Sequence, residues 1–349
     1  MLSSCLLISS VIKKFAGGGG EAITILPMDP TSSSSSSLRW RILRKALINR
    51  SDSQSQAEIK RVSRKATQGF NLIPCQLVAS ALEDSREACV CYTIPIPPSP
   101  KLYLTQRVDN CSDLNDFEIS NRHNIDNTGL VCQWPSEEVL AYFCMSQPDR
   151  FRGKRVIELG SGYGLAGLVI AATTEASEVV ISDGNPQVVN YIKRNIESNS
   201  MAFSNNRSVK AMEFHWNQHQ LSELTNTFDI IVASDCTFFK EFHKDLASII
   251  KVLLKANEPS EALFFSPKRG DSLDKFLKEI EDIGLHYVLT EKYDDQVWKR
   301  HETLVKGDDE SWPSYDKSHW DMIFKWVDLK VETFLTLCKM LSYLSFFQL

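Results

Sequence analysis

The chain has 349 residues, 43% of them hydrophobic and 24% charged, which is an ordinary composition for a globular protein. The formal net charge is −5 at pH 7. This balance argues against the dominant positive field of a nucleic-acid-binding protein, so we expect no nucleic-acid partner. The nine cysteines form no CxxC pair, so we expect reduced thiols, no metal, and a cytoplasmic or nuclear protein.

Residues 1–63 are predicted to be a flexible, partly basic segment. Residues 17–37 combine a glycine run with a serine run, a composition that buries almost no surface. Residues 38–65 carry nine Lys or Arg against Asp52 and Glu58. Apolar residues at helical spacing there predict a basic amphipathic helix that docks an acidic partner or a membrane, and a solvated tail is the alternative.

Residues 64–133 are predicted to form a small β-rich element. Short β-prone runs within residues 70–108 are separated by polar or proline clusters, which favours antiparallel pairing. The polar segment 115–129 is expected to be a loop. A helix is expected from Pro135, since proline suits the first helical position and the acidic residues that follow suit the positive end of the helix dipole.

Strands and helices then alternate along residues 134–319. The expected strands span 155–160, 178–184, 208–216, 228–235, 261–267 and 285–293, and the expected helices span 163–174, 186–199, 240–256 and 271–284. Such alternation with unbroken apolar strands predicts a mostly parallel sheet that is covered on both faces. The expected fold class is therefore α/β, doubly wound and Rossmann-like, with ligands beyond the carboxyl ends of the strands.

The segment RVIELGSGYGLAG places Gly160, Gly162 and Gly164 between a strand and a helix. Glycines allow a tight turn and a close approach of the backbone to a ligand, so we expect these three to bind a cofactor. A Walker loop is excluded because no Gly-Lys-Ser/Thr follows. A dinucleotide loop stays an alternative, because Gly162, Gly164 and Gly167 fit GxGxxG and Asp183 follows about 20 residues later.

Glu158 favours a positively charged cofactor over a dinucleotide. It lies two positions before Gly160, where a carboxylate would face a cation such as S-adenosylmethionine, unless it pairs with a nearby arginine. Asp183 would accept both ribose hydroxyls of that cofactor or cap the next helix. Trp216 would cover the adenine ring or be a core tryptophan.

A second candidate site follows the next apolar strand, in FDIIVASDCTFF. Asp235 ends this strand beside the expected cleft, and packing alone does not readily explain an acid there. Phe238 and Phe239 follow within one turn, where core packing is the alternative interpretation. His243 is expected to be a surface or core histidine rather than an acid for hydride transfer.

The stretches VIELGSGYGLAG, ISDGNP, FHWN, WPSEEVLAYFC and SDCTFF together resemble the class I, seven-strand protein-lysine methyltransferases related to family 16. These carry an E-x-G-x-G-x-G loop and a D-x-x-Y/F motif. The resemblance covers about Arg64 to His319 and implies S-adenosylmethionine as donor, calmodulin as acceptor, and stepwise methylation of one lysine to the trimethyl form. The positions that match the family's cofactor residues are Glu158, Gly160, Gly162, Asp183, Trp134 and Trp216, and those that match its acceptor motif are Asp235 and Phe238.

Residues 320–349 form an atypical tail that departs from this family. The last family strand normally follows residue 319 as a short apolar run, so the closing strand is in question here. Glu332 and Lys339 interrupt the tail, and we therefore expect no stable membrane insertion. We expect a monomer.

Three other functions stay open at this point. An NAD-dependent oxidoreductase on the same fold should place a catalytic His, Lys or Tyr after the fourth strand, where this chain has Asp-Cys-Thr-Phe-Phe. A catalytically inactive calmodulin-binding scaffold would bind through the basic helix alone. Methylation of a small molecule is the third, although no dedicated substrate lid is evident. Titration with labelled S-adenosylmethionine and with NAD would separate the methyltransferase from the first two.

Overall fold

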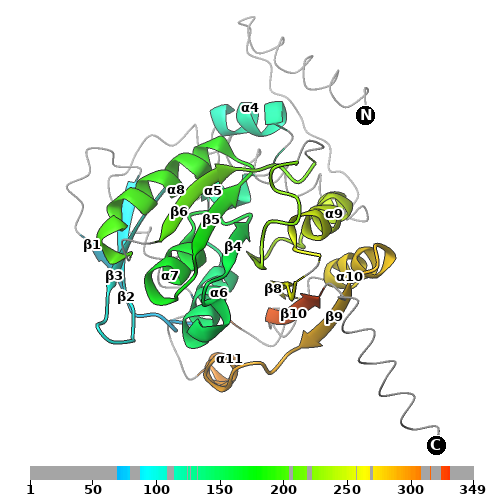
Figure 1. Cartoon of the computed structure of the whole chain (residues 1–349). Coiled ribbons are helices and arrows are strands. Elements are labelled where there is room, and N and C mark those ends of the chain that lie inside the picture. The colour runs from blue at the N-terminus through cyan, green and yellow to red at the C-terminus, as the bar shows by residue number, and fades with distance from the viewer. Residues whose placement is uncertain are drawn as a thin grey trace, which may run out of the picture. The chain divides into compact units, whose positions relative to one another are not determined.

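The computed structural model describes residues 69–78, 87–107, 114–123, 125, 127–131, 133–203, 207–217, 222–256, 258–267, 270–307, 315 and 324–330. They form two β-sheets and the helices that cover them (Figure 1). The predicted flexible segment 1–63, with its basic helix, lies outside the described residues. The same is true of the tail beyond residue 330.

The smaller sheet contains three antiparallel strands, β1 (Cys75–Val78), β2 (Glu87–Thr93) and β3 (Lys101–Arg107), in the order β1-β2-β3. This agrees with the antiparallel element expected within residues 70–108. The outer edge of β3 is bound by side chains of a neighbouring helix. Asn195 accepts from the amide of Thr105 at 2.8 Å, and Asn199 accepts from the amide of Tyr103 at 2.8 Å. Edge amides that a sheet leaves unpaired are thereby satisfied.

The larger sheet has seven strands in the order β6-β5-β4-β7-β8-β10-β9. Their bounds are β4 Arg155–Leu159, β5 Glu178–Asp183, β6 Ser208–Glu213, β7 Ile230–Ser234, β8 Glu261–Pro267, β9 His286–Thr290 and β10 Phe324–Lys330. Strands β4 to β8 run parallel, while β10 is antiparallel to both of its neighbours. The chain order reverses between β4 and β7, which makes the carboxyl ends of these strands the expected ligand site.

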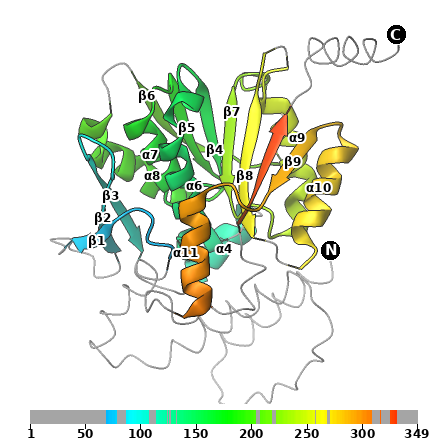
Figure 2. The same ribbon diagram turned by 90° about the horizontal axis from the view of Figure 1, so that it is seen from below.

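Helices cover both faces of the larger sheet, as the doubly wound prediction requires. The α-helices that follow β3 are α4 Leu114–His123, α5 Thr128–Val131, α6 Pro135–Ser146, α7 Leu165–Thr173, α8 Pro186–Ser198, α9 His243–Leu253, α10 Ser272–Asp282 and α11 Asp295–Lys306, with short 3-10 turns at Pro148–Phe151, Ser200–Ala202 and Lys240–Phe242. Alternate residues of β7 enter two separate cores. Ile230 and Val232 pack with α6, α7 and α8, whereas Ile231 and Ala233 pack with α9 and α10. Figure 2 shows these layers from a second direction.

The loop predicted for residues 115–129 is wrong, because this segment contains most of α4 and the start of α5. The segment is poor in apolar residues, so its sequence lacks the stripe that marks a helix. Its anchor is an ion pair instead. Both oxygens of Asp116 accept from the guanidinium of Arg107, at 3.0 and 2.9 Å, and Asp116 is only 1% exposed. Helical periodicity does not reveal this anchor, because Arg107 lies seven residues before the helix begins.

The closing strand that the sequence left in question is present. β10 lies within the atypical tail and pairs with β8 on one side and with β9 on the other. The helix α11 also had no counterpart in the sequence analysis. No helix in the described part of the chain is long and apolar enough to cross a membrane.

Candidate functional site

The glycine turn follows β4 and leads directly into α7. Gly160, Gly162 and Gly164 have φ angles of +60°, +55° and +82°, and Gly164 is the N-cap of α7. These left-handed angles suit glycine, because a Cβ would be strained there. At Gly160 a Cβ would also lie 2.8 Å from Cys236 Sγ and 3.2 Å from the ring of Trp216. The three predicted glycines therefore form a bare-backbone turn that a bulkier residue would block.

Asp183 ends β5 and faces this turn. Its Oδ2 accepts from the amide of Gly162 at 3.1 Å, and its Oδ1 accepts from the amide of Asn185 at 2.8 Å. The helix cap that was the alternative role of Asp183 belongs to Asn185, whose side chain accepts from the amide of Gln187 at 2.9 Å. A carboxylate oxygen can accept more than one hydrogen bond, so these two contacts do not exclude the hydroxyl groups of a ribose.

A helical turn that the sequence analysis treated as loop covers the glycine turn. A Cβ on Gly129 of α5 would lie 3.4 Å from the Cα of Gly162 and 3.5 Å from Oδ2 of Asp183. Asn127 holds this segment, because its amide donates to the carbonyl of Asp116 at 2.9 Å and its Oδ1 accepts from Asn185 at 3.1 Å. Gly129 is thus a further residue of the site. Its signal in the sequence is that it is a glycine, the residue that allows two backbones to approach closely.

Glu158 lies beneath the turn rather than in an open cleft. Its side chain is 0% exposed, and its Oε2 accepts from the amide of Gly167 at 2.8 Å. Burial and the neighbouring Glu137 hold the pKa of Glu158 well above its usual value. No arginine or lysine in the described ranges is recorded as its partner, so the alternative of an arginine pair gains no support. A direct contact between Glu158 and a cofactor stays a prediction.

Glu137 of α6 is a functional candidate that the sequence analysis missed. It was read only as an acid at the start of a helix, but it is 5% exposed and faces the sheet. Its Oε1 accepts from the amide of Ala166 at 2.8 Å, and its Oε2 accepts from the hydroxyl of Ser234 at 2.6 Å. The sequence signal for its burial is its spacing along the helix. Glu137 lies three and seven residues before Leu140 and Cys144, so it shares a helix face with these buried residues.

Asp235 follows β7 and adopts a left-handed backbone with φ of +53°. Its amide donates to the carbonyl of Phe265 at 2.9 Å, which fixes the turn against β8. Non-glycine residues with such angles are uncommon, and they cluster at functional sites. The next residue, Cys236, donates through Sγ to the carbonyl of Leu159 at 3.2 Å. The turn that carries Asp235 is therefore bound to the end of β4, next to the glycine turn.

A series of aromatic rings connects the two candidate sites. Phe238 contacts Phe239 with ring centroids 4.8 Å apart, and Phe239 contacts Phe242 at 6.1 Å. Phe242 in turn contacts Trp216 at 6.1 Å, beside Gly160. Phe239 is 9% exposed whereas Phe238 is half-buried, so core packing explains the first better than the second. Trp134 is the half-buried N-cap of α6, and its contact with a cofactor stays a prediction.

The acceptor motif is held from behind by two residues at helix starts. His243 is buried, and its Nε2 lies 2.8 Å from the carbonyl of Thr237, to which it can donate. The hydroxyl of Ser272 donates to the same carbonyl and to that of Phe238, the latter at 3.1 Å. Burial lowers the pKa of His243, so the ring is neutral at physiological pH. This confirms the interpretation of His243 as a core histidine.

The arrangement fits a nucleoside-bearing cofactor at the glycine turn. The bare turn admits a ligand close to the backbone, Asp183 offers acceptors for ribose, and Trp216 offers a flat apolar ring. No group of three or more His, Cys, Asp or Glu among the described residues could hold a metal ion.

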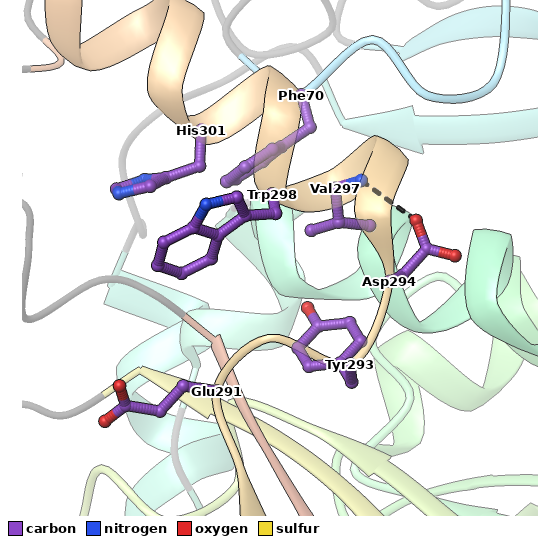
Figure 3. A pocket seen from close by; sticks show the side chains of 7 residues that line it. All are labelled: Phe70, Glu291, Tyr293, Asp294, Val297, Trp298 and His301. Carbon is purple, nitrogen blue, oxygen red and sulfur yellow. Dashed lines mark hydrogen bonds between the residues drawn. The ribbon is translucent and has the colours of Figure 1, made fainter.

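A separate hollow lies between α11 and the segment before β1 (Figure 3). Its volume of about 10 Å³ is enough for about one water molecule. Its lining residues are Phe70, Glu291, Tyr293, Asp294, Val297, Trp298 and His301. None of these belongs to the glycine turn or to the acceptor motif, and the hollow is too small for a cofactor.

Comparison with known proteins connects this site to a family. Residues 114–283 match the family model described as lysine methyltransferase. A calmodulin-lysine N-methyltransferase from Arabidopsis thaliana is 84% identical over 294 residues, which covers 84% of this chain and 96% of that protein. The human protein-lysine N-methyltransferase EEF2KMT is 24% identical over 191 residues, which covers 51% of this chain and 57% of that protein.

Among solved structures, a putative S-adenosylmethionine-dependent methyltransferase from Streptococcus mutans is similar with a TM-score of 0.42 and 16% identity. The match covers 72% of this chain and 57% of that chain.

Proposed function

Because the chain belongs to the lysine methyltransferase family, we propose that it transfers methyl groups from S-adenosylmethionine to one lysine of calmodulin, up to the trimethyl form. The observation that carries the choice of calmodulin is the 84% identity to the Arabidopsis calmodulin-lysine N-methyltransferase across 96% of that protein. Identity at this level spans both the cofactor turn and the acceptor motif. It favours the same acceptor over a small molecule.

The cofactor half of the site would use backbone groups and one carboxylate. Gly160, Gly162 and Gly164 leave room for a ligand against the chain, while Asp183 would accept from the ribose hydroxyls. Trp216 would lie against the adenine ring. When bound, S-adenosylmethionine supplies a methyl group on a sulfonium, which an amine displaces in line.

The acceptor half of the site must deliver a neutral amine. A free lysine has a pKa of about 10.4, so roughly one molecule in a thousand is deprotonated near pH 7.4, a handicap of about 4 kcal/mol. The half-buried Phe238 would lower that pKa by excluding water from the ammonium group. Aromatic faces also attract methylated ammonium groups, which would allow repeated rounds of transfer.

Asp235 is assigned to the orientation of the amine. Its negative charge would favour the ammonium form, so it cannot be the group that lowers the lysine pKa. The backbone amide of Asp235 donates to the carbonyl of Phe265, which fixes the turn, and the carboxylate on that turn can instead direct the amine toward the methyl group and accept its proton. Alignment of the reacting atoms is the main contribution that such a site can make.

The basic segment 38–65 supports an acidic partner such as calmodulin. Its excess of Lys and Arg would attract a negative protein to an otherwise negative enzyme. This steering should weaken as salt rises beyond physiological strength. Equal salt slopes for the full chain and for a chain that starts near Arg64 would remove the docking arm from the proposal.

The decisive experiment is mass spectrometry of calmodulin after incubation with the full chain and S-adenosylmethionine. We expect mass gains of one, two and three methyl groups on one lysine. Asp235→Asn keeps a residue that tolerates a left-handed backbone, and Phe238→Ala removes the ring. Each should lower kcat by about 100-fold while the Kd for S-adenosylmethionine changes by less than about threefold.

A matched control is Phe203→Ala, which removes another half-buried ring, beyond α8 and outside both candidate sites, and should change kcat much less. If calmodulin gains no mass while another protein or a small molecule does, the proposed acceptor is wrong. If NAD binds and S-adenosylmethionine does not, the cofactor assignment fails. Binding of calmodulin without transfer would identify an inactive scaffold.

A further inference from the structure

Two glutamates from different elements meet beneath the glycine turn. Glu137 of α6 is 5% exposed and Glu158 of β4 is 0% exposed. Their carboxylates accept from adjacent amides at the start of α7, Glu137 from Ala166 and Glu158 from Gly167, so the two groups lie side by side. No lysine or arginine in the described ranges is recorded as a hydrogen-bond or ion-pair partner of either. A buried pair of acids in contact needs a proton, because two carboxylates accept hydrogen bonds and cannot donate one.

The electrostatics allow only one of these acids to be ionised. Two unit charges about 4 Å apart repel by about 4 kcal/mol at an effective dielectric constant near 20. The other ionisable groups that face the pair are Asp183 from β5, Cys236 after β7 and Cys144 from α6. All three are acids, so they add no positive charge that could stabilise a second carboxylate.

The hydrogen-bond donors show which acid keeps its charge. Glu137 accepts at both oxygens, from Ala166 and from Ser234. Glu158 accepts at Oε2 from Gly167, and its buried Oε1 has no hydrogen-bond donor. Hydrogen bonds to a carboxylate stabilise its charged form. Burial and Glu137 accordingly raise the pKa of Glu158 well above its usual value.

We propose that Glu158 carries a proton on Oε1 and donates it to an ionised Glu137, which makes Glu137 a positioning residue for methyl transfer. The positioning role rests on the proposed function, whereas the shared proton does not. Glu137 then binds three elements at once: the start of α7 through Ala166, β4 through Glu158, and the end of β7 through Ser234.

This arrangement sets the distance between the two halves of the site. The glycine turn that would hold the cofactor lies between β4 and α7, and Asp235 follows Ser234 directly. Glu137 binds Ala166, just after the glycine turn, and Ser234, just before Asp235, so it links the donor side of the reaction to the acceptor side. A displacement of about 1 Å between reacting atoms can reduce a rate by about 100-fold, so one buried carboxylate in this place has a large effect on catalysis.

The proton can be detected on the full chain without any substrate. At about pH 8, where free glutamic acids are ionised, the infrared spectrum should contain the C=O band of a buried protonated carboxyl group. The band should disappear in both Glu158→Gln and Glu137→Gln, because one proton between two acids is no longer needed when either becomes an amide. Glu138→Gln is the matched control and should keep the band, since Glu138 is a half-buried acid of the same helix that accepts from the amides of Leu72 and Ile73 instead.

Absence of this band in the unmodified chain, or its survival in both Gln variants, would overturn the shared proton. Should the variants fail to fold, the unmodified chain is titrated alone. The band must then weaken as pH rises through the pKa of Glu158. A chain that methylates another acceptor would still show the band. The shared proton and the choice of calmodulin are therefore tested independently.

The positioning role is tested by removal of one contact of Glu137. Ser234→Ala deletes the hydroxyl that donates to Oε2 and should lower kcat about tenfold, while KM for S-adenosylmethionine changes by less than about twofold. Ser136→Ala is the control, since its buried hydroxyl on the same helix has no hydrogen-bond partner. Equal kcat values for the two variants, or an equal loss in kcat and in affinity, would reduce Glu137 to a structural residue.

Discussion

Polar groups are hydrogen-bonded differently in two regions of the molecule. One region is the carboxyl ends of β4, β5 and β7, and the other is the hollow beside α11. At the strand ends, the carboxylates of Asp183 and Glu137 each accept from two recorded donors. In the hollow, the buried hydroxyl of Tyr293 has no hydrogen-bond partner and points toward Val297 and Trp298 (Figure 3). The first region fixes two carboxylates around one turn, whereas the second leaves a buried hydroxyl without a hydrogen bond.

This difference shows which hollow of a protein deserves a functional interpretation. A defined opening between α11 and Phe70 has the form of a pocket, yet the hydrogen bonds recorded for its polar side chains cap α11 or lead to residues outside the opening, such as Glu302 and Tyr315. At the strand ends, the donors and acceptors converge on one turn. Fixed polar groups around a bare backbone are the better mark of a catalytic site.

The sharpest test of the first region is Gly160→Ala. The added Cβ would lie 2.8 Å from Cys236 Sγ on a backbone with φ of +60°, so the turn and the Trp216 ring must shift. We expect the rate of methyl transfer to fall by about 100-fold or more, measured as kcat/KM. Gly153→Ala is the control, because Gly153 has φ of +68° with nothing within 4 Å of an added Cβ. It should destabilise the fold by about 1 kcal/mol through strain alone. Similar activity in both variants would remove the close approach at Gly160 from the account.

The buried acid pair predicts a dependence of stability on pH. The pKa of Glu158 is raised in the folded chain, whereas it is about 4.3 in the unfolded chain. Between these two values the folded state holds a proton that the unfolded state has lost, so the free energy of unfolding falls as pH rises. Glu158→Gln cannot titrate. Its free energy of unfolding, relative to the unmodified chain, should therefore increase by up to about 1.4 kcal/mol per pH unit.

Urea unfolding near pH 6 and near pH 8 measures this effect. The buried His243 and His301 titrate in both proteins, so their contributions cancel in the difference. A difference that is the same at both pH values would mean that Glu158 is ionised throughout.

The smallest effects should come from the hollow. Tyr293→Phe removes a hydroxyl that has no partner, so the free energy of unfolding should change by less than about 0.5 kcal/mol. Tyr315→Phe is the matched change nearby, and it deletes a hydroxyl 2.6 Å from Nδ1 of His301. We expect a loss of about 1 kcal/mol, measured by urea unfolding. If Tyr293→Phe were the more harmful of the two, the hollow would hold an ordered partner that gives it a role.

The sequence predicted the parts of this molecule that depend on local pattern. The glycines, Asp183 and Asp235 follow apolar strands, and parallel strands bring their carboxyl ends to one edge. Residues that act through distant partners were missed. Helix α4 depends on the pair between Arg107 and Asp116, and the role of Glu137 depends on elements that come later in the chain. A helix dipole explained an acid at that position equally well, so the spacing of Glu137 on the helix face of Leu140 and Cys144 did not by itself indicate its role.

Helix α11 is a different kind of omission, because its signals were present in the sequence. Asp294 accepts from the amides of Gln296 and Val297, and Gly307 ends the helix with φ of +75°. An acid before the helix and a glycine after it are ordinary boundary signals. The strand β10 had no such marks, since its place is set by the open edges of β8 and β9.

The position of β10 also bears on how the chain folds during synthesis. Ribosomes release β8 and β9 well before residues 324–330, yet the late strand must slot between them. Until β10 emerges, the edges of β8 and β9 have unpaired amides and carbonyls. Such exposed strand edges are prone to self-association. A nascent polypeptide paused before this point would be a natural client for chaperones.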